Sequence, residues 1–88
     1  MELVNYMEEV VKRVFQELTS GEPYRDIQFT EKMKLDIYAY TLNHLPPRYI
    51  VTEKGHLYTR LNELQQQFQT DLVVEITKAI QQVKANPR

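Results

Sequence analysis

The stretch Lys34–Tyr49, KLDIYAYTLNHLPPRY, decides how this chain is organised. Its first residues have helical spacing, and the Pro46-Pro47 pair forces the helix to end around Asn43 or His44. The reason is that proline disfavours helical geometry in the residue that precedes it. The stretch therefore predicts a helix with an abrupt end, followed by extended chain.

The chain before this stretch is predicted to form a long helix and a packed loop. Leu3–Leu18 has apolar residues at almost ideal helical spacing, and Gly21 is the expected left-handed residue at its end. Residues 22–29 are too apolar for a free linker, so we expect them to pack on the domain. Thr30 is the expected N-cap of the next helix, Glu31–Asn43.

The helix Glu31–Asn43 carries apolar side chains on almost every side. Leu35, Ala39 and Leu42 share one face, and Met33, Ile37 and Tyr40 flank that face. A helix with this distribution contacts neighbours on two sides, so we expect it to be the central helix of the domain.

The chain after the prolines is predicted to be extended and then helical again. Arg48–Thr52 is rich in β-branched and aromatic residues, and His56–Tyr58 is a possible answering strand, so a small hairpin or an extended arm is expected. Thr59 is the expected cap of a last helix from about Arg60 to Lys84, with a possible break at Gln69–Asp71. The predicted fold is mainly α, with three to four helices and one short extended or hairpin segment.

Length and composition limit the class of protein. The 88 residues make one small domain, 1–88, and the net charge of -1 does not favour nucleic acid or an anionic membrane. The N-terminus has acidic residues inside its apolar stretch, unlike a signal peptide, and no apolar run approaches the roughly 20 residues of a membrane span. The absence of cysteine fits a reducing compartment. We expect a cytoplasmic protein.

A homodimer is expected because the chain is short. A single core of this size rarely supplies more than about 3–5 kcal/mol, and no disulfide is available to add to it. The last helix is too long for two shorter helices to cover. Its apolar middle is the candidate dimer surface, which comprises Leu72, Val73, Val74 and Ile76.

The sequence contains no constellation typical of an enzyme or a metal site. His44 and His56 are far apart and belong to no metal-binding motif. Ser20 is the only serine and lies in a helix-ending turn, and the two isolated glycines cannot form a phosphate-binding loop. We therefore expect no catalytic activity, no metal and no cofactor.

Ligand binding has more support than catalysis. Six tyrosines in 88 residues suit a site that is half apolar and half wet. Lys34 and Arg48 supply cations in the central stretch, and Asp36 and Asn43 supply hydrogen-bonding groups. The alternative is that the tyrosines form the core and its rim while the cations are solvated, and spacing alone leaves both possibilities open.

The central stretch resembles the late-competence ComFB family of small bacterial proteins. The shared pattern is D-x-x-A-x-x-L-N-x-[LV]-x-P-x-Y followed by a Tyr-Thr pair, carried here by Asp36, Ala39, Leu42, Asn43, Leu45, Pro47, Tyr49, Tyr58 and Thr59. The opening LVNYMEEVV is also similar to the start of that family, so the resemblance covers nearly the whole chain. Many relatives carry a C-x-x-C at the places of Thr30 and Met33, which this chain lacks.

The resemblance implies a mostly helical, cytoplasmic homodimer that binds cyclic di-GMP or cyclic di-AMP. Such a receptor would relay the signal to motility, competence or cell-size control through a protein partner that the sequence does not identify. Six residues are the predicted ligand contacts: Lys34 or Arg48 for a phosphate, Asp36 and Asn43 for purine edges, and Tyr40 or Tyr49 for stacking. The alternative is a helical adaptor or dimerisation module without a small-molecule ligand.

Overall fold

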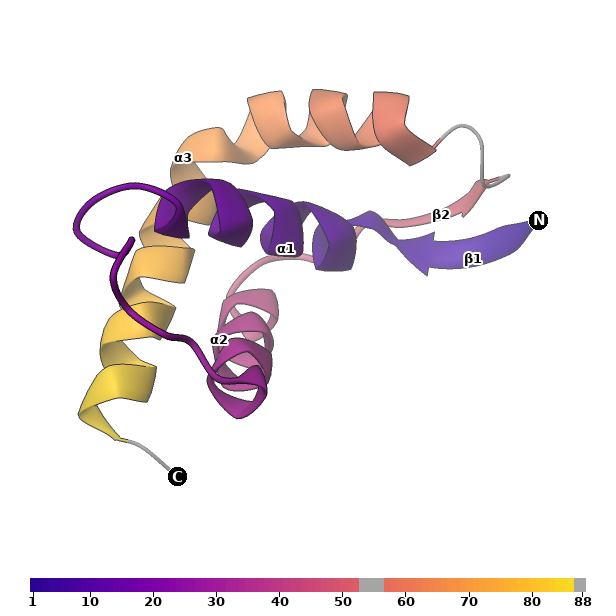
Figure 1. Ribbon diagram of the computed structural model, residues 1–88. Coiled ribbons are helices and arrows are strands. Elements are labelled where there is room, and N and C mark those ends of the chain that lie inside the picture. The colour runs from indigo at the N-terminus through magenta and orange to yellow at the C-terminus, as the bar shows by residue number, and fades with distance from the viewer. Residues whose placement is uncertain (53–56, 87–88) are drawn as a thin grey trace.

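The computed structural model describes residues 1–52 and 57–86, and its elements are three helices and two short strands (Figure 1). In chain order they are β1 (Glu2–Asn5), α1 (Tyr6–Thr19), α2 (Glu31–Asn43), β2 (Tyr49–Thr52) and α3 (Leu57–Ala85). The mainly α prediction is confirmed, and the extended segment is one strand of a two-stranded ribbon. None of the helices in this part of the chain combines the length and apolarity needed to cross a membrane.

The first helix begins later than predicted because Asn5 caps it. The Asn5 side chain accepts a hydrogen bond from the Met7 amide at 3.2 Å, so the helix starts at Tyr6 and the preceding residues form β1. The prediction for its end was also wrong, since Gly21 does not have a positive φ. α1 closes instead on Ser20, which has right-handed helical geometry and donates its amide to the Gln16 carbonyl.

The ribbon joins the two ends of the N-terminal half of the chain. β1 pairs antiparallel with β2, with Leu3 opposite Val51 and Val4 opposite Ile50. The predicted answering strand was wrong, because Leu57–Tyr58 begin α3 and Thr59 lies inside that helix rather than capping it; His56 falls outside the described residues. Val4 and Ile50 pack against the core, which anchors a ribbon that would be marginal alone.

α2 contacts both α1 and α3, as predicted. It is not the central helix, because α1 and α3 also contact each other and α1 has six buried residues against two in α2. Thr30 caps it, with its hydroxyl oxygen 3.1 Å from the Met33 amide. Ile37 and Thr41 are the buried residues of α2, whereas Leu35, which shares a face with Ala39 and Leu42, is 61% exposed. The loop before α2 packs down as expected, with Tyr24 and Phe29 against the core.

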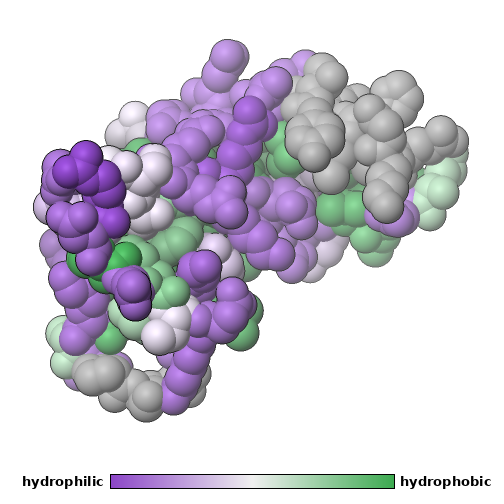
Figure 2. Space-filling model, in the orientation of Figure 1, coloured by the Kyte–Doolittle hydropathy of each residue, from purple (hydrophilic) through white to green (hydrophobic). Residues whose placement is uncertain are grey.

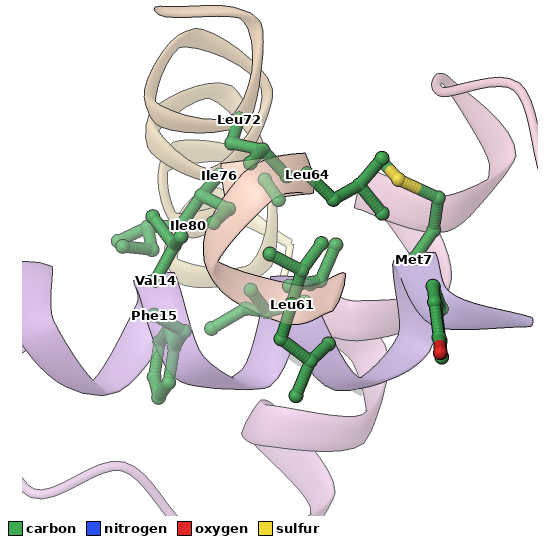
Figure 3. Packing of buried hydrophobic residues seen from close by; sticks show 13 residues of the cluster. Met7, Val14, Phe15, Leu61, Leu64, Leu72, Ile76 and Ile80 are labelled. Carbon is green, nitrogen blue, oxygen red and sulfur yellow. The ribbon is translucent and has the colours of Figure 1, made fainter. Parts of the chain in front are cut away.

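α3 is bent at Phe68, whose φ of -116° and ψ of 18° are not helical. The predicted break at Gln69–Asp71 therefore occurs one residue earlier. The bend sends the two halves of α3 in different directions, one along α1 and one past α2 (Figure 1). It allows apolar residues of both halves to reach the same core (Figure 3).

The bend also changes the predicted dimer surface. Leu72 and Ile76 are fully buried in the core of the protomer, together with Val10 and Val14 of α1. Burial of each such side chain contributes about 1.5–3 kcal/mol to folding. Leu72 and Ile76 thus have no surface to offer a second copy, and of the four predicted residues only Val73 and Val74 are accessible.

Candidate functional site

The six predicted ligand contacts do not form one site, because α2 separates them. Lys34 lies in the first turns of α2, whereas Asn43 is its last residue and Arg48 and Tyr49 follow it. At 1.5 Å per residue, Lys34 and Asn43 are about 13 Å apart along the helix axis. The N-terminal and C-terminal ends of α2 therefore have to be considered separately.

At the C-terminal end, the backbone of Arg48 is held by the start of α1. The Arg48 amide donates to Asn5 Oδ1 at 2.9 Å, and the Arg48 carbonyl accepts from the Tyr6 amide at 2.8 Å. Since Asn5 Oδ1 also accepts from Met7, one side-chain oxygen ties β1, α1 and the chain after the prolines together. This gives a structural reason for the asparagine in the opening LVNYMEEVV.

The guanidinium of Arg48 lies over the Phe68 ring at 5.2 Å, at the bend of α3. This is cation–π geometry, so the side chain contributes to holding the bend. Tyr40 is also engaged: its ring stacks on His44 at 4.2 Å, and His44 Nδ1 is 2.6 Å from the Tyr40 carbonyl oxygen. Asn43, Arg48 and Tyr49 are the exposed residues among the predicted contacts at this end, and Tyr49 is 64% exposed.

At the N-terminal end of α2 there is a pocket of about 290 Å³ that contains Lys34. It lies between the end of α1, the loop before α2 and the first turns of α2. Its apolar lining is Phe15, Ile27 and Phe29, and its polar lining is Gln16, Thr19, Ser20, Lys34 and Tyr38.

The floor of this pocket is an aromatic cluster. Phe15 makes edge-to-face contacts with Phe29 at 5.2 Å and with Tyr38 at 5.4 Å. Such pairs contribute about 0.5–1.5 kcal/mol beyond the burial of their area. The cluster gives the pocket a fixed apolar floor, onto which a planar ring can pack.

The charged groups near the pocket leave Lys34 available for an anion. Its ammonium is 3.9 Å from a carboxylate oxygen of Glu31, and the Glu31 side chain is 84% exposed. Exposed pairs at this distance contribute little. Burial, and secondarily the charge of Glu31, raises the pKa of Tyr38 above its ordinary value of 10.0. A tyrosine phenol is protonated at neutral pH with or without this shift, so it can donate a hydrogen bond.

Of the residues that line this pocket, only Lys34 was among the ligand contacts predicted from the sequence. Tyr38 lies four residues after Lys34 and so shares its helix face, which was a usable signal. Phe15 and Thr19 come from a helix far away in sequence, and their spacing carried no sign of a shared pocket. Asp36, the remaining predicted contact, is half-buried on α2 and does not line it.

A second pocket, of about 550 Å³, is lined only by polar side chains of α1 and the first half of α3. Glu17, one of its lining residues, accepts from Gln65 Nε2 at 2.8 Å and lies 3.7 Å from Arg13 Nε. The pocket offers no apolar floor. Within residues 1–52 and 57–86, no group of three His, Asp or Glu side chains is placed to hold a metal ion.

The fold and these sites define a small, mainly helical domain with a two-stranded ribbon and an aromatic, lysine-edged pocket. The model of one protein family, the late competence development protein ComFB, matches residues 4–87. The chain belongs to the ComFB family.

A solved structure supports the same fold. The late competence protein ComFB from Bacillus subtilis superposes with a TM-score of 0.72, at 22% sequence identity, over 99% of this chain and 93% of that one. At this level of identity the likeness shows the fold alone. Among proteins with curated descriptions, none matches this sequence.

Proposed function

We propose that this protein is a non-enzymatic receptor for a cyclic dinucleotide, cyclic di-GMP or cyclic di-AMP, and that it acts in the cytoplasm. The observation that carries the proposal is the position of Lys34 at a pocket with a floor of aromatic rings. A cyclic dinucleotide needs a cation for each phosphate and a flat apolar surface for each purine. This pocket offers one cation and one aromatic surface, which match one phosphate and one purine of such a ligand.

The size of the pocket indicates how much of the ligand enters. A volume of about 290 Å³ is near the lower limit of small-molecule sites, about 300–1,000 Å³. One purine fits such a space, and the remainder of the ligand would lie outside, with a phosphate near Lys34. Lys34, rather than Arg48, is the proposed phosphate contact of this pocket, because Lys34 lines it and Arg48 does not.

The exposed residues at the C-terminal end of α2 are proposed to contact another protein. Asn43 and Tyr49 are open to solvent on a backbone held by Asn5. We propose that this end, rather than the pocket, meets the downstream partner protein in a homodimeric receptor. Binding of the ligand at one end and of the partner at the other would let α2 couple the two events.

Calorimetric titration tests the proposal, with cyclic di-GMP, cyclic di-AMP and a linear dinucleotide as ligands. The wild-type protein is expected to bind at least one cyclic ligand. Lys34→Gln should weaken that binding about 10-fold, since it removes a charge-assisted hydrogen bond of about 1.5 kcal/mol. No heat with either cyclic ligand at high micromolar concentration would overturn the proposal.

Lys78→Gln is the matched control for Lys34→Gln. Lys78 is also paired with a glutamate three residues earlier, Glu75 at 3.6 Å, and its side chain is exposed on α3 away from the pocket. Its substitution should leave the dissociation constant unchanged within experimental error. Equal weakening by both variants would mean that Lys34 acts only through the net charge of the protein.

The second candidate is an adaptor or dimerisation module, and the outer face of the ribbon favours it. Leu3, Tyr49 and Val51 are 72%, 64% and 65% exposed there. Figure 2 shows apolar, green atoms at the end of the molecule where β1 and β2 lie. If Val51→Lys changes the molecular mass in solution and no cyclic dinucleotide binds, this function replaces the first.

A further inference from the structure

The second pocket, of about 550 Å³, lies between α1 and the first half of α3, which run alongside each other (Figure 1). Two of its lining residues are charged, and their charges offset each other, because Arg13 Nε and Glu17 Oε1 are 3.7 Å apart. The other four carry carboxamides and come from α3: Asn62, Gln65, Gln66 and Gln69. A lining of this kind suits a neutral ligand that forms many hydrogen bonds.

The carboxamides lie on a well-packed stretch of helix, and most of their hydrogen-bonding groups are unused. Leu61 and Leu64 are buried in the core, which fixes the first half of α3 against α1. Gln65 donates to Glu17 at 2.8 Å. The other three carboxamides form no hydrogen bond within the part of the chain that the structure describes. Their donors and acceptors are therefore available to a ligand.

The spacing of these carboxamides matches the repeat of an extended peptide. Asn62 and Gln66 are four residues apart on α3, which corresponds to about 6 Å along the helix axis. An extended chain presents the N–H and C=O of every second residue on one edge, about 6.6–6.8 Å apart. A carboxamide has both an acceptor and donors, so it can pair with the N–H and the C=O of one such residue. Two carboxamides thus match two alternate residues of one strand.

A small molecule matches this pocket less well than a peptide does. Small-molecule sites are lined mainly by apolar side chains with a few polar groups, whereas none of the six residues here is apolar. An extended segment gains affinity from hydrogen bonds to its main chain, and it has such groups along its whole length. The same groups occur in every peptide, so recognition of this kind tolerates many sequences.

We propose that this pocket is a docking site for an extended peptide segment of another protein, whose main chain is bound by Asn62 and Gln66. Gln69, one residue beyond the bend at Phe68, is a third contact. The site shares no lining residue with the pocket of Lys34, and it does not depend on a cyclic dinucleotide. It adds a second protein contact to the one proposed at the C-terminal end of α2.

NMR titration with the capped peptide acetyl-Thr-Ala-Thr-Ala-Thr-Ala-amide tests the proposal, because side-chain amides give their own signals in proton–nitrogen correlation spectra. The peptide should shift the side-chain signals of Asn62 and Gln66 saturably, with a dissociation constant near the millimolar range. The same peptide N-methylated at every residue lacks the N–H donors and should bind at least about 10-fold more weakly.

Two variants show whether the carboxamide itself binds the peptide. Gln66→Met keeps a side chain of similar shape without the amide, and it should weaken binding about 5-fold. Gln81→Met is the matched control, because Gln81 is an exposed glutamine of α3 that does not line the pocket, and it should leave the dissociation constant unchanged. The spectrum of each variant shows whether the fold is retained.

Several results would overturn the docking site. They are the absence of saturable shifts at millimolar peptide, equal binding of the N-methylated peptide, and equal effects of Gln66→Met and Gln81→Met. Shifts of the pocket signals that follow the concentration of the protein without any peptide would assign this face to a second copy of the chain instead. Failure to bind a cyclic dinucleotide would overturn the proposed function and leave this proposal standing.

Discussion

The two ends of α2 are built from similar residue types but do different work. At the N-terminal end, Thr30 caps the helix and Lys34 lies beside an open pocket. At the C-terminal end, the cation is Arg48, and both its backbone groups and its guanidinium are engaged by the protein itself. A cation next to aromatic rings thus belongs to the proposed ligand site at one end and to a structural contact at the other.

The difference shows that the contacts of a cationic side chain, rather than its residue type, decide whether it can bind a ligand. Arg48 has an aromatic ring within 5.2 Å, whereas the nearest acid to Lys34 is 3.9 Å away and 84% exposed. Exposed pairs contribute about 0–1 kcal/mol, so a phosphate competes easily for Lys34.

The largest expected effect at the C-terminal end comes from Asn5→Ala. It removes the cap of α1, which contributes about 1 kcal/mol, and the acceptor of the Arg48 amide, which contributes about as much again. The free energy of unfolding should fall by about 2 kcal/mol, and the Tm by about 10 °C, in denaturant and thermal unfolding.

Two further variants show whether this loss of unfolding free energy comes from the hydrogen bond between Asn5 and the Arg48 amide. Asn5→Asp keeps both acceptor bonds and should stay within about 0.5 kcal/mol of wild type. Thr30→Ala removes only a cap, at the other end of α2, and should cost about 1 kcal/mol. If Asn5→Ala costs no more than Thr30→Ala, the bond to Arg48 contributes nothing and the two ends are alike.

The sequence alone predicted most of the helices because their signals are local. Thr30, the Pro46-Pro47 pair and the apolar spacing define α2 without reference to the rest of the chain. The start of α1 was missed because Leu3 and Val4 continue its helical spacing, while Val51 and Ile50, their strand partners, lie nearly 50 residues further on. Strand pairing between distant segments overrode a local periodicity.

The site was less predictable than the fold because it is formed by residues that are distant in the sequence. Lys34 was predicted as a cation of the central stretch, but Phe15, Thr19 and Ser20 join it only through the packing of α1 against α2. The contact between Arg48 and Phe68 could not be predicted from the sequence, because it depends on the bend of α3. The buried state of Leu72 and Ile76 depends on that same bend.

A smaller effect is expected from the contact between Arg48 and Phe68. A double-mutant cycle of Arg48→Ala and Phe68→Leu should give a coupling energy of about 0.5–1 kcal/mol, the usual contribution of an exposed cation–π pair. Denaturant unfolding of the four proteins measures it. A coupling energy indistinguishable from zero would mean that the guanidinium does not hold the bend, and Arg48 would again be available as a phosphate contact.

The smallest expected effect concerns Tyr38 at the N-terminal end, and it appears only at alkaline pH. Burial, with a lesser contribution from Glu31, raises the pKa of Tyr38 above 10.0 in the folded protein. The unfolded chain therefore loses this proton first as the pH rises, so the folded state gradually loses stability above about pH 10 and is unaffected below it. Tyr38→Phe should have a shallower alkaline decline than wild type in unfolding experiments between about pH 9 and about pH 11.

Glu31→Gln separates the two causes of that shift. Because Glu31 is the lesser cause and its side chain is 84% exposed, this variant should keep most of the wild-type decline, whereas Tyr38→Phe should lose the whole contribution of this group. Equal declines in wild type and Tyr38→Phe would show that the phenol is as well solvated in the folded protein as in the unfolded one. The aromatic floor would then be open to water, and the N-terminal end of α2 would lose the dry surface on which a purine is proposed to pack.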